Sequence, residues 1–240
     1  MRAFYNDTDR YCCDWLSNLM DAGHITPGVI DDRPIQEISG NEVIGFERAH
    51  FFAGIAGWEV ALNLAGWRGR CWTGSCPCQP LSSAGQRKGH ADERHLWPAF
   101  YELIAECAPP VVFGEQVASK DGREWLAGVR LDLEGLGYAC GAADLPAAGV
   151  AAPHRRQRIW WVADSLGDEQ PGQEPCGRQA RRVGGQFEPL PWRDGWETAL
   201  SLLRIVDDGI PRLVAATDAA RNAIVPQVAA EFIRAYREIA

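Results

Sequence analysis

The sequence has no long apolar run and little positive charge overall. No stretch of its 240 residues approaches the roughly 20 apolar residues that span a bilayer. The first residues, MRAFYNDTDRYCC, show neither the apolar stretch nor the cleavage pattern of a secretory signal. The formal net charge of -8 argues against a surface coated in positive charge for general nucleic-acid binding. We therefore expect a cytoplasmic protein with no membrane partner.

Lysine is nearly absent. Only Lys88 and Lys120 are lysines, so 22 of the 24 basic residues are arginines. Seven of these arginines fall within residues 154–193, against five acidic residues, which gives that stretch a local charge of +2. The planar guanidinium matches phosphate groups and base edges in a way that an ammonium group cannot. The arginine cluster therefore favours a nucleic-acid contact in this part of the chain.

A second cysteine pair is also missing. Structural zinc sites use four ligands, usually as two spaced pairs, and no Cys or Cys/His cluster complements Cys76 and Cys78. We therefore expect no metal. A reducing compartment disfavours disulfides, and a free thiol among apolar neighbours behaves as a small hydrophobe. Five cysteines fit that description: Cys12, Cys13, Cys71, Cys107 and Cys140.

Short apolar stretches alternate with amphipathic ones along the chain. This alternation predicts an α/β domain with a mostly parallel sheet. With 46% hydrophobic residues, a chain of this length can bury one substantial core, so we expect one main domain. The predicted strands lie near residues 3–5, 28–30, 49–54, 70–74, 109–117 and 158–164. The predicted helices lie after Asp9, near 58–65, 96–104 and 123–136, and from Pro226 onward.

A glycine-bearing turn, FFAGIAGW at 51–58, joins a predicted strand to a predicted helix. Small residues at such a turn let a ligand lie against the backbone, although close packing explains them equally well. A cofactor that carries a ribose usually also needs a carboxylate at the end of the next strand, roughly 20 residues on. Between Glu59 and Asp92 the sequence contains no acidic residue. The turn by itself therefore leaves both interpretations open.

Five motifs follow one another along the chain. They read FFAGIAGW (51–58), SCPCQPLSSAG (75–85), GEQV (114–117), PHRRQR (153–158) and RNAIVP (221–226). Together, and in this order, they resemble the motifs of the cytosine carbon-5 DNA methyltransferase family. SCPCQPLSSAG is similar to the family's Pro-Cys-Gln loop, with Cys76 at a position usually held by proline. The other four are similar to its glycine, Glu-Asn-Val, Pro-Gln-x-Arg-x-Arg and closing Gly-Asn-Ala-Val-x-Pro motifs.

The resemblance implies a Rossmann-like S-adenosylmethionine-dependent methyltransferase that acts on double-stranded DNA. Cys78, followed by Gln79, would be the nucleophile that adds to carbon 6 of cytosine. Glu115 would donate or share a proton at N3, and Arg156 and Arg158 would hold the base and steady Glu115. The residues expected to bind S-adenosylmethionine are Phe52, Ala53, Gly54, Ile55, Gly57, Trp58, Pro77 and Asn222.

Two further motifs precede the glycine turn instead of following it. FYNDTDRYCCDWL (4–16) resembles the family's second motif, which implies that Asp7 binds the ribose. GVIDDRPI (28–35) resembles the third motif, which implies that Asp31 meets the adenine. We therefore expect the second and third strands of the family's sheet to precede the first in sequence, in a phage or prophage type of the family. Alternatively, both aspartates are ordinary turn and cap residues.

The resemblance also places the DNA contacts. Residues 82–95 match a loop that closes behind a flipped base, with contacts from Ser82, Arg87, Lys88 and Arg94; a solvated polar loop is the alternative. Residues 165–211 correspond to a short target recognition segment, or to a disordered insert. The catalytic domain would comprise 1–164 and 212–240, and we expect a monomer. Within the recognition segment the expected DNA contacts are Arg178, Arg181 and Arg182.

Four residues depart from the family pattern: Gln116 replaces Asn, His154 replaces Gln, and Ala56 and Arg221 each replace Gly. A left-handed backbone at a former glycine would be strained, so the departures leave a weakened enzyme open. Three functions therefore remain at this point. They are an active DNA cytosine methyltransferase, a related enzyme that acts on tRNA or another RNA, and a catalytically silent nucleic-acid-binding protein.

Overall fold

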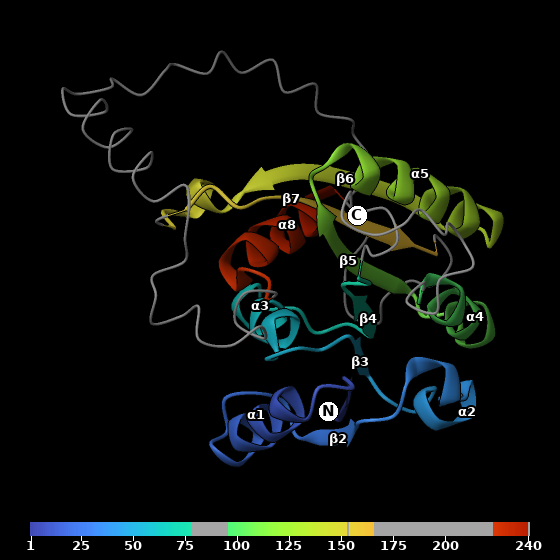
Figure 1. The fold of residues 1–240 in the computed structure, drawn as a ribbon, viewed down its shortest axis with the longest axis vertical. Coiled ribbons are helices and arrows are strands. Elements are labelled where there is room, and N and C mark those ends of the chain that lie inside the picture. Colours follow the sequence, from blue (N-terminus) through green and yellow to red (C-terminus); the bar gives the residue numbers. More distant parts are fainter. Residues whose placement is uncertain (78–95, 153, 166–222, 240) are drawn as a thin grey trace, which may run out of the picture.

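The structure is a computed structural model that describes residues 1–77, 96–152, 154–165 and 223–239. Its centre is a seven-stranded sheet in the order β2-β1-β3-β4-β5-β7-β6 (Figure 1). The first five of these strands are parallel, whereas β7 pairs antiparallel with β5 and β6. The mostly parallel sheet is thus confirmed. The strand bounds are β1 Ala3–Asn6, β2 Gly28–Asp31, β3 Arg48–Phe51, β4 Cys71–Gly74, β5 Val111–Val117, β6 Ala139–Pro146 and β7 Gln157–Asp164.

Helices cover both faces of the sheet. One face carries α1 (Arg10–Asp21), α3 (Gly57–Leu64) and α8 (Pro226–Ile239), and the other carries α2 (Gly40–Val43), α4 (Trp97–Cys107) and α5 (Lys120–Gly135) (Figure 1). Two short 3-10 helices, η1 (Ile35–Glu37) and η3 (Ala147–Val150), connect these elements. None of the helices in the described ranges is long and apolar enough to cross a membrane.

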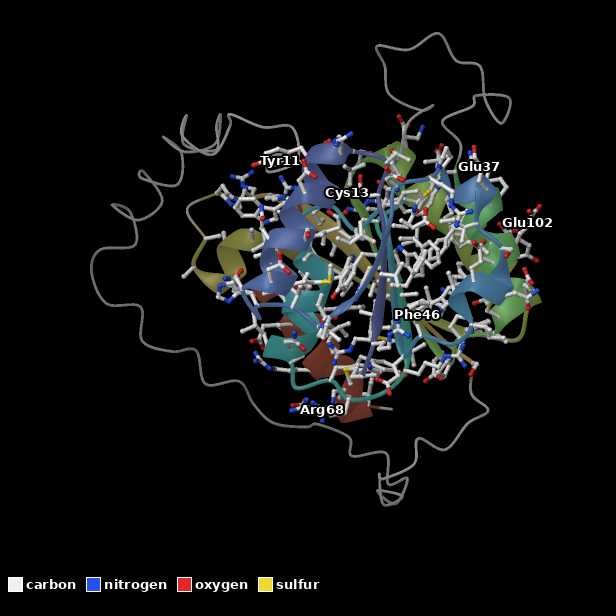
Figure 2. All side chains as sticks on the ribbon, turned by 90° about the horizontal axis from the view of Figure 1, so that it is seen from below. Tyr11, Cys13, Glu37, Phe46, Arg68 and Glu102 are labelled. Atoms are coloured by element: carbon white, nitrogen blue, oxygen red, sulfur yellow. The ribbon has the colours of Figure 1, made fainter. Side chains whose placement is uncertain are left out.

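Alternation along β3 divides its side chains between the two layers. Ala49 and Phe51 belong to the core beneath α2, α4 and α5. Arg48 and His50 point to the opposite face, where His50 stacks on Tyr5. All four residues of β3 are buried, as expected for a central parallel strand. Side chains fill both sides of the sheet in Figure 2, and the labelled Phe46, which is partly buried, packs against the core cluster that contains Ala49 and Phe51.

Local signals account for most helix boundaries. The Asp9 side chain accepts a hydrogen bond from the Tyr11 amide and caps α1, as the sequence predicted. Ser119 caps α5 by accepting from the Gly122 amide, so this helix begins at Lys120, earlier than the predicted start near Arg123. The predicted strand at 49–54 ends at Phe51, because Phe52 and Gly54 adopt positive φ angles.

Candidate functional site

The carboxyl ends of four parallel strands meet at one edge of the sheet. Asn6 pairs with Phe51, Phe51 with Gly74, and Gly74 with Gly114. The residues that follow these positions therefore lie side by side along the edge. In open α/β sheets, ligands bind outside the carboxyl ends of the strands. The edge brings together Asp7, the turn 52–56, the segment 75–77 and Glu115.

The glycine-bearing turn adopts an unusual backbone conformation. Phe52, Gly54 and Ala56 have φ angles of +54°, +54° and +69°. The Ala53 amide donates to the carbonyl of Asn6 at 2.9 Å, which binds the turn to β1. A Cβ added at Gly54 would meet nothing within 4 Å, so there is open space above the backbone at this point. The turn can therefore receive a ligand against its main chain.

Asp7 lies at the end of β1, next to this turn. Its Oδ2 accepts from the Gly54 amide at 2.7 Å, and its Oδ1 accepts from the Asp9 amide at 2.9 Å. Burial raises the pKa of the Asp7 carboxyl, and the two amide bonds act in the opposite direction. A carboxylate offers about four lone-pair sites, so both oxygens retain acceptor capacity for ligand hydroxyls. The contact with Asp9 is typical of a turn, whereas the contact with Gly54 joins residues 47 positions apart.

Asp31, at the end of β2, accepts hydrogen bonds from Arg33 with both of its carboxylate oxygens. Arg33 donates from Nη2 to its Oδ2 at 2.6 Å and from Nε to its Oδ1 at 3.1 Å. Its Oδ1 also accepts from the Arg33 backbone amide. These hydrogen bonds lower the pKa of the Asp31 carboxyl. A contact between Asp31 and adenine therefore stays a prediction, because the structure shows this carboxylate in its turn arrangement with Arg33.

The first residues of α3 contact segments that lie at the same edge of the sheet. The buried Trp58 indole donates from Nε1 to Ser75 Oγ at 3.0 Å, so it contacts the segment that leads to Pro77. Gly57 allows Ile224 to approach closely, since a Cβ at Gly57 would lie 2.5 Å from Ile224 Cγ1. The motif resemblance gave no role to Ile224, although this residue lies in the stretch RNAIVP. Pro77 is exposed and is the last described residue before Cys78, whereas Phe52 and Ile55 are partly buried.

Glu115 is the acid at the other end of the edge. It is 9% exposed, and its Oε1 lies 2.7 Å from Arg158 Nε. Burial raises the pKa of the Glu115 carboxyl, although the charges of Arg158 and Arg156 act to lower it. A buried carboxyl with a raised pKa can hold a proton that an exposed one would lose. The predicted pairing of Glu115 with Arg158 is present in the structure.

Arg156 joins this end of the edge to the segment before α8. Its Nη2 donates to the carbonyl of Ala223 at 2.6 Å, across 67 residues of sequence. Its backbone has a φ angle of +35°, a region that non-glycine residues adopt at an energetic cost. Burial lowers the pKa of the Arg156 guanidinium, with a further contribution from the charge of Arg158. Arg156 therefore combines a strained backbone with a long-range tertiary contact.

Gln116 stands where the resembled motif has Asn, and its contacts give this difference a structural account. The buried Gln116 side chain donates from Nε2 to the carbonyl of Cys76 at 3.2 Å and accepts from the Val117 amide at 2.9 Å. The side chain thus connects β5 to the residue two positions before Cys78. Cys76 itself is 3% exposed, which supports a packing role.

Several predicted site residues fall outside the described ranges, and their roles stay predictions. They are Cys78, Gln79, Ser82, Arg87, Lys88, Arg94, Arg178, Arg181, Arg182 and Asn222. Within the described ranges, no group of three or more His, Cys, Asp or Glu side chains is placed to hold a metal ion.

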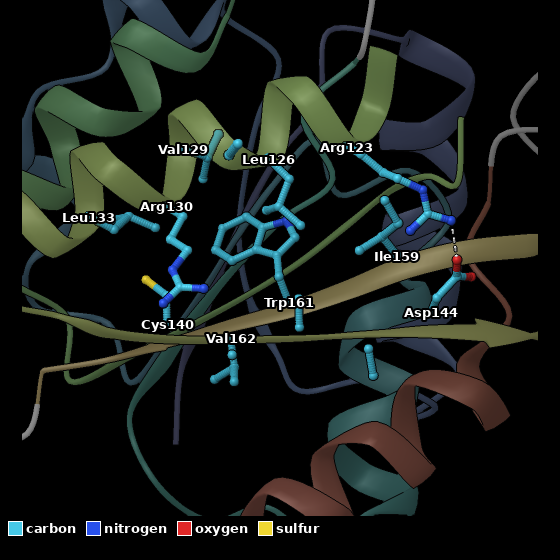
Figure 3. A pocket seen from close by; sticks show the side chains of 14 residues that line it. Arg123, Leu126, Val129, Arg130, Leu133, Cys140, Asp144, Ile159, Trp161 and Val162 are labelled. Carbon is cyan, nitrogen blue, oxygen red and sulfur yellow. Dashed lines mark hydrogen bonds and ion pairs between the residues drawn. The ribbon is translucent and has the colours of Figure 1, made fainter. Parts of the chain in front are cut away.

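A separate cavity of about 440 Å³ lies between α5 and the strands β6 and β7 (Figure 3). Its lining is mostly apolar and includes Trp161 and Ile159. Arg123 at its rim is paired with Asp144. Side chains alternate along β7, so Arg158 lies on the opposite face of the sheet from Ile159 and Trp161, which line the cavity. The cavity and the Glu115–Arg158 pair therefore lie on opposite faces of the sheet.

The fold and the edge residues define an α/β protein with a glycine-bearing turn of unusual backbone conformation and a Glu–Arg ion pair at one edge of its sheet. Residues 70–170 match the family model described as C-5 cytosine-specific DNA methylase. The matched stretch contains β4, β5, β6 and β7, and with them Glu115, Arg156 and Arg158.

Two curated relatives are similar to this chain over 92 and 90 residues. The chain is 33% identical over 92 residues to the type II methyltransferase M.AplI of Arthrospira platensis, covering 38% of this chain and 27% of the relative. It is 34% identical over 90 residues to the type II methyltransferase M.HhaI of Haemophilus parahaemolyticus, covering 36% and 28%. The aligned part thus spans little more than a quarter of the length of these relatives.

Among solved structures, the chain matches the methyltransferase EhMeth of Entamoeba histolytica. That likeness has a TM-score of 0.45 at 14% identity and covers 70% of this chain and 55% of EhMeth. The Dnmt2 methyltransferase of S. pombe gives a TM-score of 0.39 at 15% identity, covering 74% and 58%.

Proposed function

We propose that the protein transfers a methyl group from S-adenosylmethionine to carbon 5 of cytosine in DNA. The observation that carries this proposal is the Glu115–Arg158 pair, which lies within the stretch that matches the C-5 cytosine methylase model. The pair occupies the same sheet edge as the Asp7–Gly54 contact. An acid for the base and an acceptor for the cofactor are therefore available along one edge.

The residues of the turn fit S-adenosylmethionine. Asp7 has acceptor capacity for the ribose hydroxyls, and the space above Gly54 is open. When bound, S-adenosylmethionine supplies an electrophilic methyl group. Phe52, Ala53 and Ile55 would line its position along the turn.

The proposed chemistry begins at Cys78. Carbon 5 of cytosine is a poor nucleophile until a group adds to carbon 6, so the thiolate of Cys78 forms a bond to carbon 6. Electron density then moves toward N3, where the Glu115 carboxyl donates or shares its proton. Arg158 stabilises the carboxylate form of Glu115, and Arg156 lies close enough to act on the same group electrostatically. After methylation, loss of the carbon-5 proton restores the double bond and expels the Cys78 thiolate.

Carbon 6 is out of reach inside a duplex, so we infer that the base is flipped out of double-stranded DNA. The residues proposed to contact DNA are in 82–95 and in the recognition segment 165–211. We further propose a rearranged member of the family, of phage or prophage type, and the order of the strands supports the rearrangement. β1 and β2, with Asp7 and Asp31 at their ends, precede β3 in sequence but lie beside it in the sheet.

The proposal is tested with purified protein, labelled S-adenosylmethionine and DNA that contains 5-fluorocytosine. Fluorine cannot leave as a proton does, so the enzyme should remain covalently attached to the DNA. Wild type and Cys76→Ser should be trapped only with the cofactor present, whereas Cys78→Ser should not be trapped. Trapping that survives in Cys78→Ser would refute the assignment of the nucleophile. Methylation of tRNA but not DNA would identify the RNA enzyme, and cofactor binding with no transfer to either polymer would identify the silent protein.

A further inference from the structure

A buried polar network lies directly beneath the glycine-bearing turn. Arg48 and Glu59 are both 0% exposed and form an ion pair at 2.8 Å between Nη1 and Oε1. His50, which is 2% exposed, contacts Glu59 Oε2 through Nε2 at 3.0 Å. Replacing a buried ion pair by apolar residues of similar volume is often neutral or stabilising. Stability alone therefore gives no sufficient reason for charges at this position.

The network connects the two elements that flank the turn. His50 is the second-last residue of β3, and Glu59 lies in the first turn of α3. Between them run the residues with positive φ angles, which include the non-glycine residues Phe52 and Ala56. Backbone conformations of this kind persist only where contacts with the surrounding residues hold them in place. The contact between His50 and Glu59 joins the strand before the turn to the helix after it.

Both oxygens of the Glu59 carboxylate are engaged. Besides Arg48, Oε1 accepts from the hydroxyl of Thr26, just before β2, and from Asn63 Nδ2 at 3.1 Å. Oε2 faces His50, whose Nδ1 contacts Thr73 Oγ1 at 2.8 Å. Thr73 lies on β4, the strand that leads to the segment before Cys78. One carboxylate thus ties α3 to β3 and to the entry of β2, and through His50 to β4.

We propose that Glu59 is a positioning residue that holds the turn 52–56 in its ligand-binding conformation before the ligand arrives. The identity of that ligand, S-adenosylmethionine, rests on the proposed function. Glu59 acts through the backbone of the turn and through His50, and its burial keeps it from touching the ligand itself. Its loss should therefore weaken ligand binding by more than the loss of stability explains.

The test uses Glu59→Gln, which preserves the shape of the side chain and removes its charge. We expect the dissociation constant for S-adenosylhomocysteine, measured by calorimetry, to rise about tenfold or more, since binding must then order the turn. In the ligand-free protein, amide hydrogen exchange at Ala53, Gly54 and Ala56 should accelerate relative to strand amides such as Phe113. All three turn amides are hydrogen-bonded in the structure, so their protection can be followed.

Leu62→Ala is the matched control. Leu62 is fully buried on the same helix and makes no hydrogen bond to the network. This substitution should lower the melting temperature but leave the affinity and the relative protection of the turn unchanged. If Glu59→Gln does not fold, the double variant Arg48→Met/Glu59→Met fills the same space without charge. It should unfold near the wild-type temperature and still show weak binding and fast exchange in the turn.

A folded Glu59 variant with wild-type affinity and wild-type protection of the turn would overturn the proposal. Equal losses of affinity in Leu62→Ala and Glu59→Gln at equal loss of stability would overturn it too. A wild-type protein that binds neither S-adenosylmethionine nor S-adenosylhomocysteine would refute the proposed function instead. The exchange measurement, made without ligand, would still decide the role of Glu59.

Discussion

At the scale of single residues, Asp7 makes one contact that its local sequence predicts and one that it does not. The turn contact with Asp9 is local, whereas the contact with the Gly54 amide depends on the pairing of β1 with β3. Asp7→Ala should weaken S-adenosylmethionine binding by about 1.5 to 3 kcal/mol, the range for hydrogen bonds to a charged group. Equilibrium binding of the cofactor measures the effect.

Asp9→Ala is the control for this prediction. It removes the cap of α1 and should cost about 1 kcal/mol of stability while leaving cofactor affinity intact. Unchanged affinity in a folded Asp7→Ala variant would show that Asp7 is only a turn residue.

Glu115 gives a prediction about pH. Its pKa in the folded protein is raised above the ordinary value of 4.5, chiefly by burial. The folded state therefore binds the proton more tightly than the unfolded state, and this contribution to stability is present at low pH. It is lost as the pH rises from about 4.5 through the folded pKa. The unfolding free energy of wild type minus that of Glu115→Gln should thus fall with pH across this window and level off above it.

Denaturant unfolding at a series of pH values measures this difference. The substitution also removes the partner of Arg158, and an arginine keeps its charge over this range of pH, so this loss adds a constant offset to the difference in unfolding free energy. The slope of that difference against pH therefore reports the pKa of Glu115. A difference that grows with pH would mean that the pair with Arg158 outweighs burial and that the pKa is lowered.

At the scale of elements, the junction between α3 and the segment before α8 depends on the absence of a side chain. Gly57→Ala would place a Cβ 2.5 Å from Ile224 Cγ1, so backbone or side chain must shift. We expect a loss of about 1 to 3 kcal/mol of stability from overpacking. Chemical denaturation of Gly57→Ala, Ile224→Ala and the double variant forms a cycle. Because Ile224→Ala removes the atom that collides, the double variant should cost less than the sum of the two single changes.

Some helices and strands could be predicted from the sequence, and others could not. Strands and helices with strong apolar patterns or clear caps, such as β5 and α1, lie close to their predicted positions. β6 was missed because its sequence, ACGAADLP, has no apolar alternation, and its extended form comes from pairing with β7. The four-residue helix α2 was missed as well, since it is too short to show a periodicity.

At the scale of the whole molecule, the order of strands places a carboxylate, Asp7, next to the glycine-bearing turn although none follows the turn in sequence. β4 follows that turn in sequence and carries no acid, but the other neighbour of β3 is β1, which ends next to Asp7. α8, the last described helix, returns to cover α3, where Arg237 donates to the carbonyl of Ala65 at 2.7 Å. The two ends of the chain therefore both contribute to the region around the turn.

The sequence by itself determined the class of fold, most of its elements and, through motif resemblance, the candidate residues Asp7, Gly54, Glu115 and Arg158. It could do so because periodicity and turn chemistry are local properties. Only the tertiary structure decided which of these side chains meet. Three sets of contacts join segments that belong to, or directly follow, different strands and helices. They are the Asp7–Gly54 contact, the hydrogen bond from Gln116 to Cys76 and the contacts of the buried Glu59 carboxylate. Such contacts depend on strand order and register, which no local pattern in the chain encodes.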